Sequence, residues 1–206
     1  ATLRRLRAVA LTGLGRFDEA ASEHAIARAI ELRLYGDNPG PAVIGASLAV
    51  YNLIRAGQGQ RALVALSEAQ AIAARHLADA PELATPLKLL EALAFEANDQ
   101  GTEAAARFEA LEEIAREVFP DGTELVWTLD GRGRALLRDG RAAESVRFHG
   151  EALAILERHY EPNSLELGPT LIDLARASCT LAQSDEARAV AARAEVVDRA
   201  RAQLLA

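Results

Sequence analysis

The segment Gly15-Arg16-Phe17-Asp18-Glu19-Ala20 decides the fold, because variants of it recur through the 206-residue chain at a nearly fixed interval. The recurrences begin at Gly57, Asp99, Gly140 and Ala182, so successive starts lie 42, 42, 41 and 42 residues apart. Each variant opens with residues typical of tight turns and then continues into a helix-forming run. A constant period of this length is the signature of a repeat protein.

A second signal, halfway between these segments, keeps the same period. Four helix-capping residues follow one another at intervals of 42, namely Asp37, Asp79, Asp121 and Asn163. Aspartate and asparagine are favoured at helix N-caps, and a glutamate three residues later completes a capping box. Three of the four have that glutamate, at Glu82, Glu124 and Glu166. Two helix starts in each period predict one helical hairpin per repeat.

The stretches between the turns have the composition of closely packed helices. Apolar residues such as Leu63, Leu66 and Ile72 recur at three- and four-residue spacing, while aromatic residues make up only 4%, which argues against a sheet. Small residues recur where two helices would meet, at Ala8, Ala92, Gly133 and Ala175 in the first helices and at Ala20, Ala62, Ala104 and Ala187 in the second. The predicted fold class is all-α, as one array over residues 1–206 with repeats at about 1–36, 37–78, 79–120, 121–162 and 163–206.

The pattern Gly15-x-Phe17-x-x-Ala20 followed by Ala27 resembles the tetratricopeptide repeat, as do the matching segments of later repeats. The proline-bearing turns at 35–39 and 160–163 are similar to the 42-residue variant found in kinesin light chains and many bacterial regulators. The resemblance implies a right-handed superhelical α-solenoid of about five hairpins, whose first helices line a concave groove. A helical bundle of accidental regularity remains an alternative. A coiled coil fits less well, because no heptad pattern continues across the glycine and proline breaks.

The charge balance limits the classes of partner. A formal net charge of −7 repels nucleic acid and anionic membrane surfaces, so neither is an expected partner. No apolar run approaches the roughly 20 residues that span a bilayer. With Cys179 as the single cysteine, we expect a cytoplasmic protein. The start at Ala1 suggests a fragment of a larger protein, and the use of arginine over lysine is typical of a GC-rich bacterial genome.

No constellation in the sequence indicates catalysis. The four histidines, His24, His76, His149 and His159, are scattered without metal-ligand spacing. The stretch from Asp130 to Arg134 contains two glycines, but it falls within a predicted first helix and no strand precedes it. We therefore predict a protein that is not an enzyme and that uses no metal and no cofactor.

The resemblance places seven candidate binding residues on the groove, namely Tyr51, Arg55, Trp127, Asp130, Arg134, Arg138 and Arg176. Trp127 is the only tryptophan and would serve as an anchor, because tryptophan is enriched in binding hot spots; alternatively it fills the joint between repeats three and four. Arginines at 134, 138 and 176 would form a basic strip that suits carboxylates. The alternative is that they pair with Asp130, Asp173 and Glu166 nearby.

These features predict a scaffold that holds a protein or peptide, of amphipathic or acidic character, in its concave groove. The alternative function is a regulatory or sensor segment of a larger bacterial signalling protein, such as a kinase, a transcription regulator or a signalling ATPase. A homodimer formed through the ends of the array is also left open.

Overall fold

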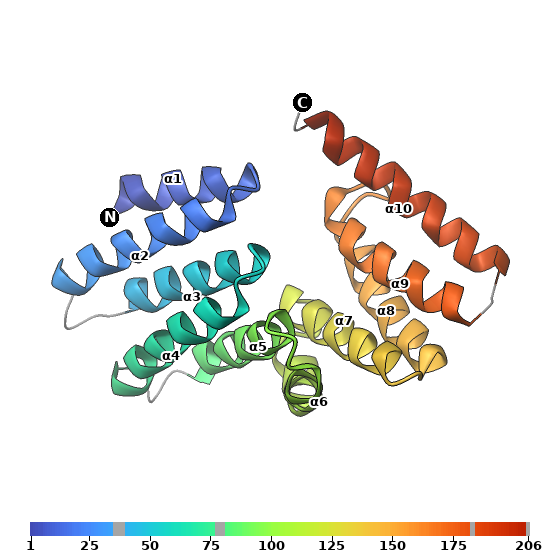
Figure 1. Cartoon of the computed structure of the whole chain (residues 1–206), viewed down its shortest axis with the longest axis horizontal. Helices are drawn as coiled ribbons and strands as arrows, with labels where there is room; N and C mark the ends of the chain where they lie inside the picture. Colours follow the sequence, from blue (N-terminus) through green and yellow to red (C-terminus); the bar gives the residue numbers. More distant parts are fainter. Residues whose placement is uncertain (35–39, 77–80, 182–183, 205–206) are drawn as a thin grey trace. The chain divides into compact units, whose positions relative to one another are not determined.

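The computed structural model describes residues 1–34, 40–76, 81–181 and 184–204 (Figure 1). Within these ranges the chain forms ten α-helices and one short 3₁₀ helix, and no strand. The helices are α1 (Thr2–Gly13), α2 (Phe17–Leu34), α3 (Gly40–Arg55), α4 (Gly59–His76), α5 (Pro81–Ala97), α6 (Gly101–Val118), α7 (Thr123–Arg138), α8 (Ala142–Leu156), η1 (Leu165–Leu167), α9 (Gly168–Thr180) and α10 (Ser184–Leu204). The all-α prediction is confirmed.

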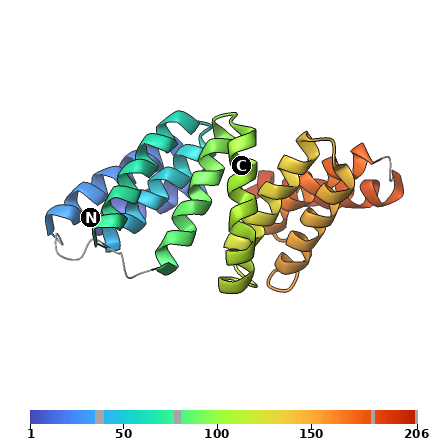
Figure 2. The ribbon, with the colours of Figure 1, turned by 90° about the horizontal axis from the view of Figure 1, so that it is seen from below.

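Successive helices pair as antiparallel hairpins, which can be followed in Figure 1 and, from below, in Figure 2. The odd-numbered helices are the first helices of their repeats and the even-numbered helices are the second. The chain divides into two compact units, unit 1 at residues 1–107 and unit 2 at residues 108–206. A single continuous array over both units stays a prediction.

Tight turns join the two helices of each hairpin at the positions that the period indicates. Gly15, Gly57 and Gly140 have φ angles of 73°, 70° and 76°, and Asp99 has φ 58°, so all four are left-handed. After each of them, the next amide donates to a carbonyl five residues earlier, as Gln58 does to Leu53 at 2.9 Å. This is the Schellman arrangement that ends a helix on a left-handed residue. The fifth predicted turn, at Ala182, lies outside the described residues.

The predicted N-caps are wrong where they can be checked. The N-cap of α7 is Gly122, without a side-chain hydrogen bond, and Asp121 instead forms an ion pair with Arg158. After Asn163 the chain makes η1, capped by Ser164, before α9 begins at Gly168. The helices start two and five residues after the predicted caps, because irregular backbone and the 3₁₀ turn intervene. Asp37 and Asp79 lie outside the described residues.

The interior of each unit is built from small and medium aliphatic side chains. In unit 1, Val50 and Leu66 are buried between α2, α3, α4 and α5; in unit 2, Leu129 and Leu171 are buried with residues of α8 and α10. Five of the eight predicted small residues are completely buried in the helix packing, namely Ala8, Ala20, Ala62, Ala92 and Ala104. A larger side chain at these positions would push the paired helices apart.

Candidate functional site

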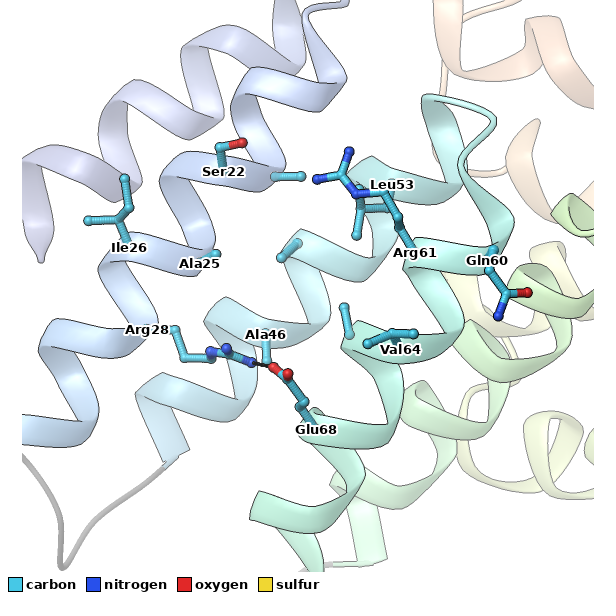
Figure 3. A pocket seen from close by; sticks show the side chains of 13 residues that line it. Ser22, Ala25, Ile26, Arg28, Ala46, Leu53, Gln60, Arg61, Val64 and Glu68 are labelled. Atoms are coloured by element: carbon cyan, nitrogen blue, oxygen red, sulfur yellow. Dashed lines mark hydrogen bonds and ion pairs between the residues drawn. The ribbon is translucent and has the colours of Figure 1, made fainter.

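Unit 1 carries an open groove between α2 and α4, with α3 as its floor (Figure 3). Its volume is about 490 Å³, which is within the range of cavities that hold a ligand or a few side chains of a partner. The floor consists of Ala46, Ala49 and Leu53, all buried by the surrounding helices. Because these residues are small or apolar, the groove is a shallow hydrophobic channel.

The walls of the groove expose aliphatic side chains to solvent. Ile26 on α2 is 43% exposed and Val64 on α4 is 56% exposed. Ile26 and Val64 lie on opposite walls in Figure 3, with Ala25 beside Ile26. Ala65 on α4 also lines the groove. Exposed aliphatic residues that line a channel are a feature of binding surfaces.

Ion pairs join the two walls of the groove. Arg28 on α2 contacts Glu68 on α4 at 2.6 Å, as Figure 3 shows. Asp18 at the start of α2 accepts from Arg61 at 2.8 Å and from Gln58 at 3.2 Å. These contacts connect α2 to α4 and surround the apolar channel with polar groups. An apolar centre with a polar rim is the common composition of an interface.

The groove lies between second helices, whereas the sequence analysis placed the binding residues on the first helices. One feature of the sequence indicates the groove between α2 and α4. Alanines at 21, 25, 46, 49 and 65 leave room between three helices, but alanine is so frequent in this chain that the signal cannot be separated from ordinary helix packing.

Tyr51 and Arg55, two of the predicted binding residues, contact each other in unit 1. Arg55 donates to the Tyr51 hydroxyl at 2.8 Å, one helical turn away on α3. Its guanidinium also lies 4.8 Å from the centroid of the Phe17 ring at the start of α2. The cation is thus held against aromatic rings while its other N–H groups face solvent.

The predicted basic strip of unit 2 is partly neutralised. Arg134 forms an ion pair with Asp173 at 3.0 Å, and Arg176 approaches the other oxygen of the same carboxylate at 3.6 Å. The alternative of pairing with a nearby acid is therefore confirmed for Asp173. Arg138, in the last turn of α7, is exposed.

Trp127 and Asp130 lie on α7 in different surroundings. Trp127 is 36% exposed, so part of its ring is available to a partner and part is packed. Asp130 is buried, which corrects the expectation that it faces an open groove. Its two carboxylate oxygens contact Nδ1 of His149 at 2.8 Å and the hydroxyl of Thr170 at 2.6 Å. Asp130 thereby links α7 to α8 and α9.

The buried Asp130–His149 pair has the composition of a catalytic dyad but not its accessibility. The His149 imidazole is fully buried and its Nε2 has no hydrogen-bond partner. A Cβ on Gly133 would lie 2.5 Å from that nitrogen, so the backbone of α7 blocks its approach to any substrate. Among the residues that the structure describes, no group of three histidine, cysteine or acidic side chains could hold a metal ion.

None of the helices in the described ranges is long and apolar enough to cross a membrane.

Known structures with the same arrangement of helices identify the fold. A candidate kinesin light chain of Podosopora anserina with nearly identical TPR-like repeats superposes with a TM-score of 0.62 at 20% sequence identity, over 96% of this chain and 94% of that one. A point variant of the same repeat protein gives 0.65 at 20% identity, over 98% and 95%. BtubC (BKLC) from P. vanneervenii gives 0.52 at 17% identity, over 91% of both chains. The chain has a TPR-like fold.

The likeness to these TPR-like proteins is one of structure. No family model matches the sequence, and no curated protein does. At about one residue in five, identity is too low to carry a binding residue from one protein to another, whereas the turns and crossings described above account for the shared fold.

Proposed function

We propose that this TPR-like chain is a non-catalytic scaffold that binds a helical segment of another protein. The observation that carries the proposal is the apolar groove of unit 1, which exposed Ile26 and Val64 line on opposite walls above a floor of alanine and leucine. An amphipathic helix with small aliphatic residues on one face fits such a channel, and its polar face would meet the charged rim.

Two further surfaces are proposed as secondary contacts, each within its own unit. In unit 1, Arg55 against Phe17 and Tyr51 offers a cation to an acidic side chain of the ligand. In unit 2, Arg134 and Arg176 around Asp173, with Arg138 and the exposed edge of Trp127, offer positive charge beside an aromatic ring. Such a surface suits an acidic or amphipathic segment, because guanidinium groups bind carboxylates in pairs.

The groove is tested by selecting peptides from a displayed library of amphipathic helices and measuring their affinity by calorimetry. Val64→Asp places a charge in the channel, and we expect affinity to fall at least about tenfold, the equivalent of roughly 1.4 kcal/mol. Val196→Asp, at an aliphatic residue of α10 with similar exposure of 43%, is the matched control and should bind normally.

The same peptides distinguish the groove from the first-helix surfaces. If the Val64→Asp variant binds normally while Arg134→Ala with Arg138→Ala, or Trp127→Ala, loses the peptide, the groove assignment is wrong and the surface predicted from the sequence is the site. Circular dichroism verifies that each variant is folded, since all the substituted side chains are at least partly exposed.

A further inference from the structure

One face of α1 exposes aliphatic side chains at positions that the later first helices cover. Leu3 is 83% exposed and Leu6 is 62% exposed, and Ala10 is also exposed. These three residues, the α1 stripe, follow one another at three- and four-residue spacing and so lie along one side of the helix. An exposed aliphatic stripe on a helix indicates a surface for another element.

The repeat register shows what this stripe does in the other hairpins. Counted from the turn residue Gly15, Leu6 is nine positions earlier and Ala10 five positions earlier. The counterparts of Ala10 in the later first helices are all buried, at Asn52, Ala94, Ala135 and Ala177. The counterparts of Leu6 are buried or half-buried, at Leu48, Leu90, Gly131 and Asp173. In the later repeats, this face of a first helix is covered by packing against neighbouring helices.

The joint between α6 and α7, inside unit 2, gives the contacts of this packing. Arg132, eight positions before Gly140, forms an ion pair with Glu112, thirteen positions after Asp99. A Cβ on Gly131, nine positions before Gly140, would lie 2.4 Å from the ring of Phe108, nine positions after Asp99. Positions are counted from the turn residue of each hairpin, negative on its first helix and positive on its second. In this joint, position −8 of α7 meets position +13 of α6, and position −9 of α7 meets position +9 of α6.

The joint between α4 and α5 in unit 1 follows the same rule. Gln70 lies thirteen positions after Gly57, and Glu91 lies eight positions before Asp99. Their side chains form a hydrogen bond of 3.3 Å. The rule therefore holds at two joints of different sequence.

The helices α1 and α10 satisfy this rule for each other. On α1, position −8 is Arg7 and position −9 is Leu6. On α10, counted from Ala182, position +13 is Glu195, whose side chain is 72% exposed, and position +9 is Ala191. Arg7 and Glu195 carry opposite charges in the same sense as Arg132 and Glu112.

The sizes of the facing side chains also match. At the α6–α7 joint a large residue on the second helix, Phe108, meets a glycine on the first. Between α1 and α10 the sizes are exchanged, because a large residue on the first helix, Leu6, would meet Ala191 on the second. The summed volume stays close to what a packed joint needs.

We propose that α1 of one molecule packs against α10 of a second copy, in the geometry of the α6–α7 joint, with Arg7 and Glu195 as the ion pair. The contact joins two different surfaces, so it is heterologous and adds copies head to tail. Each surface lies within one unit, and neither includes the groove of Figure 3, so the ligand-binding proposal stands or falls separately.

Sedimentation velocity of this chain over a range of concentrations tests the proposal. We expect the mean mass to rise above 22.0 kDa as concentration increases. Arg7→Glu alone and Glu195→Arg alone should each weaken association at least about tenfold by placing like charges together. An equimolar mixture of the two variants should associate like the original chain, because each reversed charge then meets its opposite.

Matched controls and a second disruptive variant keep this test decisive. Arg33→Glu and Glu113→Arg reverse exposed charges on α2 and α6 outside the joint and should leave association unchanged. Because Arg7 also contacts Glu23, Leu6→Asp provides a disruption that does not touch this ion pair. A chain that stays at 22.0 kDa at every concentration overturns the proposal. Association that survives Glu195→Arg also overturns it, because it would indicate that α1 pairs with α1. A mixture of the two charge-reversed variants that fails to associate overturns it as well.

Discussion

At some positions of this protein the backbone conformation restricts which residue can be accommodated, and at others burial in the interior does. Gly15, Gly57 and Gly140 occupy left-handed backbone, and a Cβ built on any of them meets no atom within 4 Å. Replacing one of these glycines would therefore cost free energy through backbone strain and not through a steric clash. Asp130, by contrast, has an ordinary helical backbone but is fixed by two hydrogen bonds in the interior.

We predict that Gly57→Ala lowers the free energy of unfolding by about 1 to 2 kcal/mol, because alanine is strained in left-handed backbone. Gly13→Ala is the matched control. Its Cβ also meets open space, but its backbone is helical, so the protein should become up to about 1 kcal/mol more stable. Urea unfolding followed by circular dichroism measures both. Equal effects of the two substitutions would contradict the conformational explanation.

His24 makes the stability of unit 1 depend on pH. Burial, followed by the charge of Arg5, holds the pKa of His24 below that of a free histidine. The unfolded chain then binds a proton that the folded chain does not, so the free energy of unfolding falls as the pH decreases through the free value of about 6.5.

Replacing His24 by leucine should remove this dependence. Leu66 occupies the equivalent position of the second repeat and is buried there, so leucine is compatible with the site. The urea midpoint of His24→Leu should be the same at about pH 7.5 and at about pH 5.5. This range lies above the one in which carboxylates titrate. His159→Leu replaces an exposed histidine and should leave the change of the urea midpoint with pH as it is in the original chain. A pH dependence that persists in His24→Leu would show that another group causes it.

Pairs of helices are spaced by the residues at their crossings. Gly131 on α7 lies against the ring of Phe108 on α6 at a separation that leaves no room for a methyl group. Ion pairs from Arg132 to Glu112 and Glu109 join the same two helices. The apolar crossing sets the distance between the helices, and the charged contacts follow it, since long side chains adapt at little cost.

Gly131→Ala should therefore destabilise the protein by about 1 to 3 kcal/mol, as overpacking does. Gly150→Ala in α8 is the control, because its Cβ would meet no atom within 4 Å and alanine favours a helix by roughly 1 kcal/mol over glycine. The melting temperature and the urea midpoint should therefore both fall for Gly131→Ala and both rise for Gly150→Ala. Destabilisation by both would mean that helix propensity does not govern the α8 site.

At the scale of the molecule, stability in a repeat protein is the sum of hairpins and the joints between neighbours. Unit 1 and unit 2 each have a hydrophobic core of their own. The hydrogen bonds of Asp130 to His149 and Thr170 lie entirely in unit 2 and connect three of its helices. A defect placed there should be felt by unit 2 first.

Thr170→Val removes a hydroxyl donor from the buried carboxylate and should cost about 1 to 3 kcal/mol. Hydrogen exchange followed by mass spectrometry should show faster exchange in peptides of α7, α8 and α9 and little change in peptides of α3 and α4. Thr180→Val, at an exposed residue of α9 whose hydroxyl binds only a backbone carbonyl, is the control. Equal acceleration across both units would show that the chain unfolds as one cooperative body.

By itself, the sequence determined the features that depend on neighbours along the chain: the hairpins, their period and the tight turns at Gly15, Gly57, Asp99 and Gly140. Backbone conformation is a local property, so a motif of six residues suffices to predict it. Even locally, the predicted caps at Asp121 and Asn163 were wrong by a few residues, because helix ends are the least strongly determined part of a helix.

Only the tertiary structure decided which polar and apolar side chains meet. Asp130 is buried because Thr170, 40 residues later, packs beside it, and Arg134 is paired because Asp173, 39 residues later, faces it. The groove between α2 and α4 likewise depends on how three helices are spaced. Contacts across such separations follow from packing, and a repeat period gives equivalent positions without giving the side chains that oppose them.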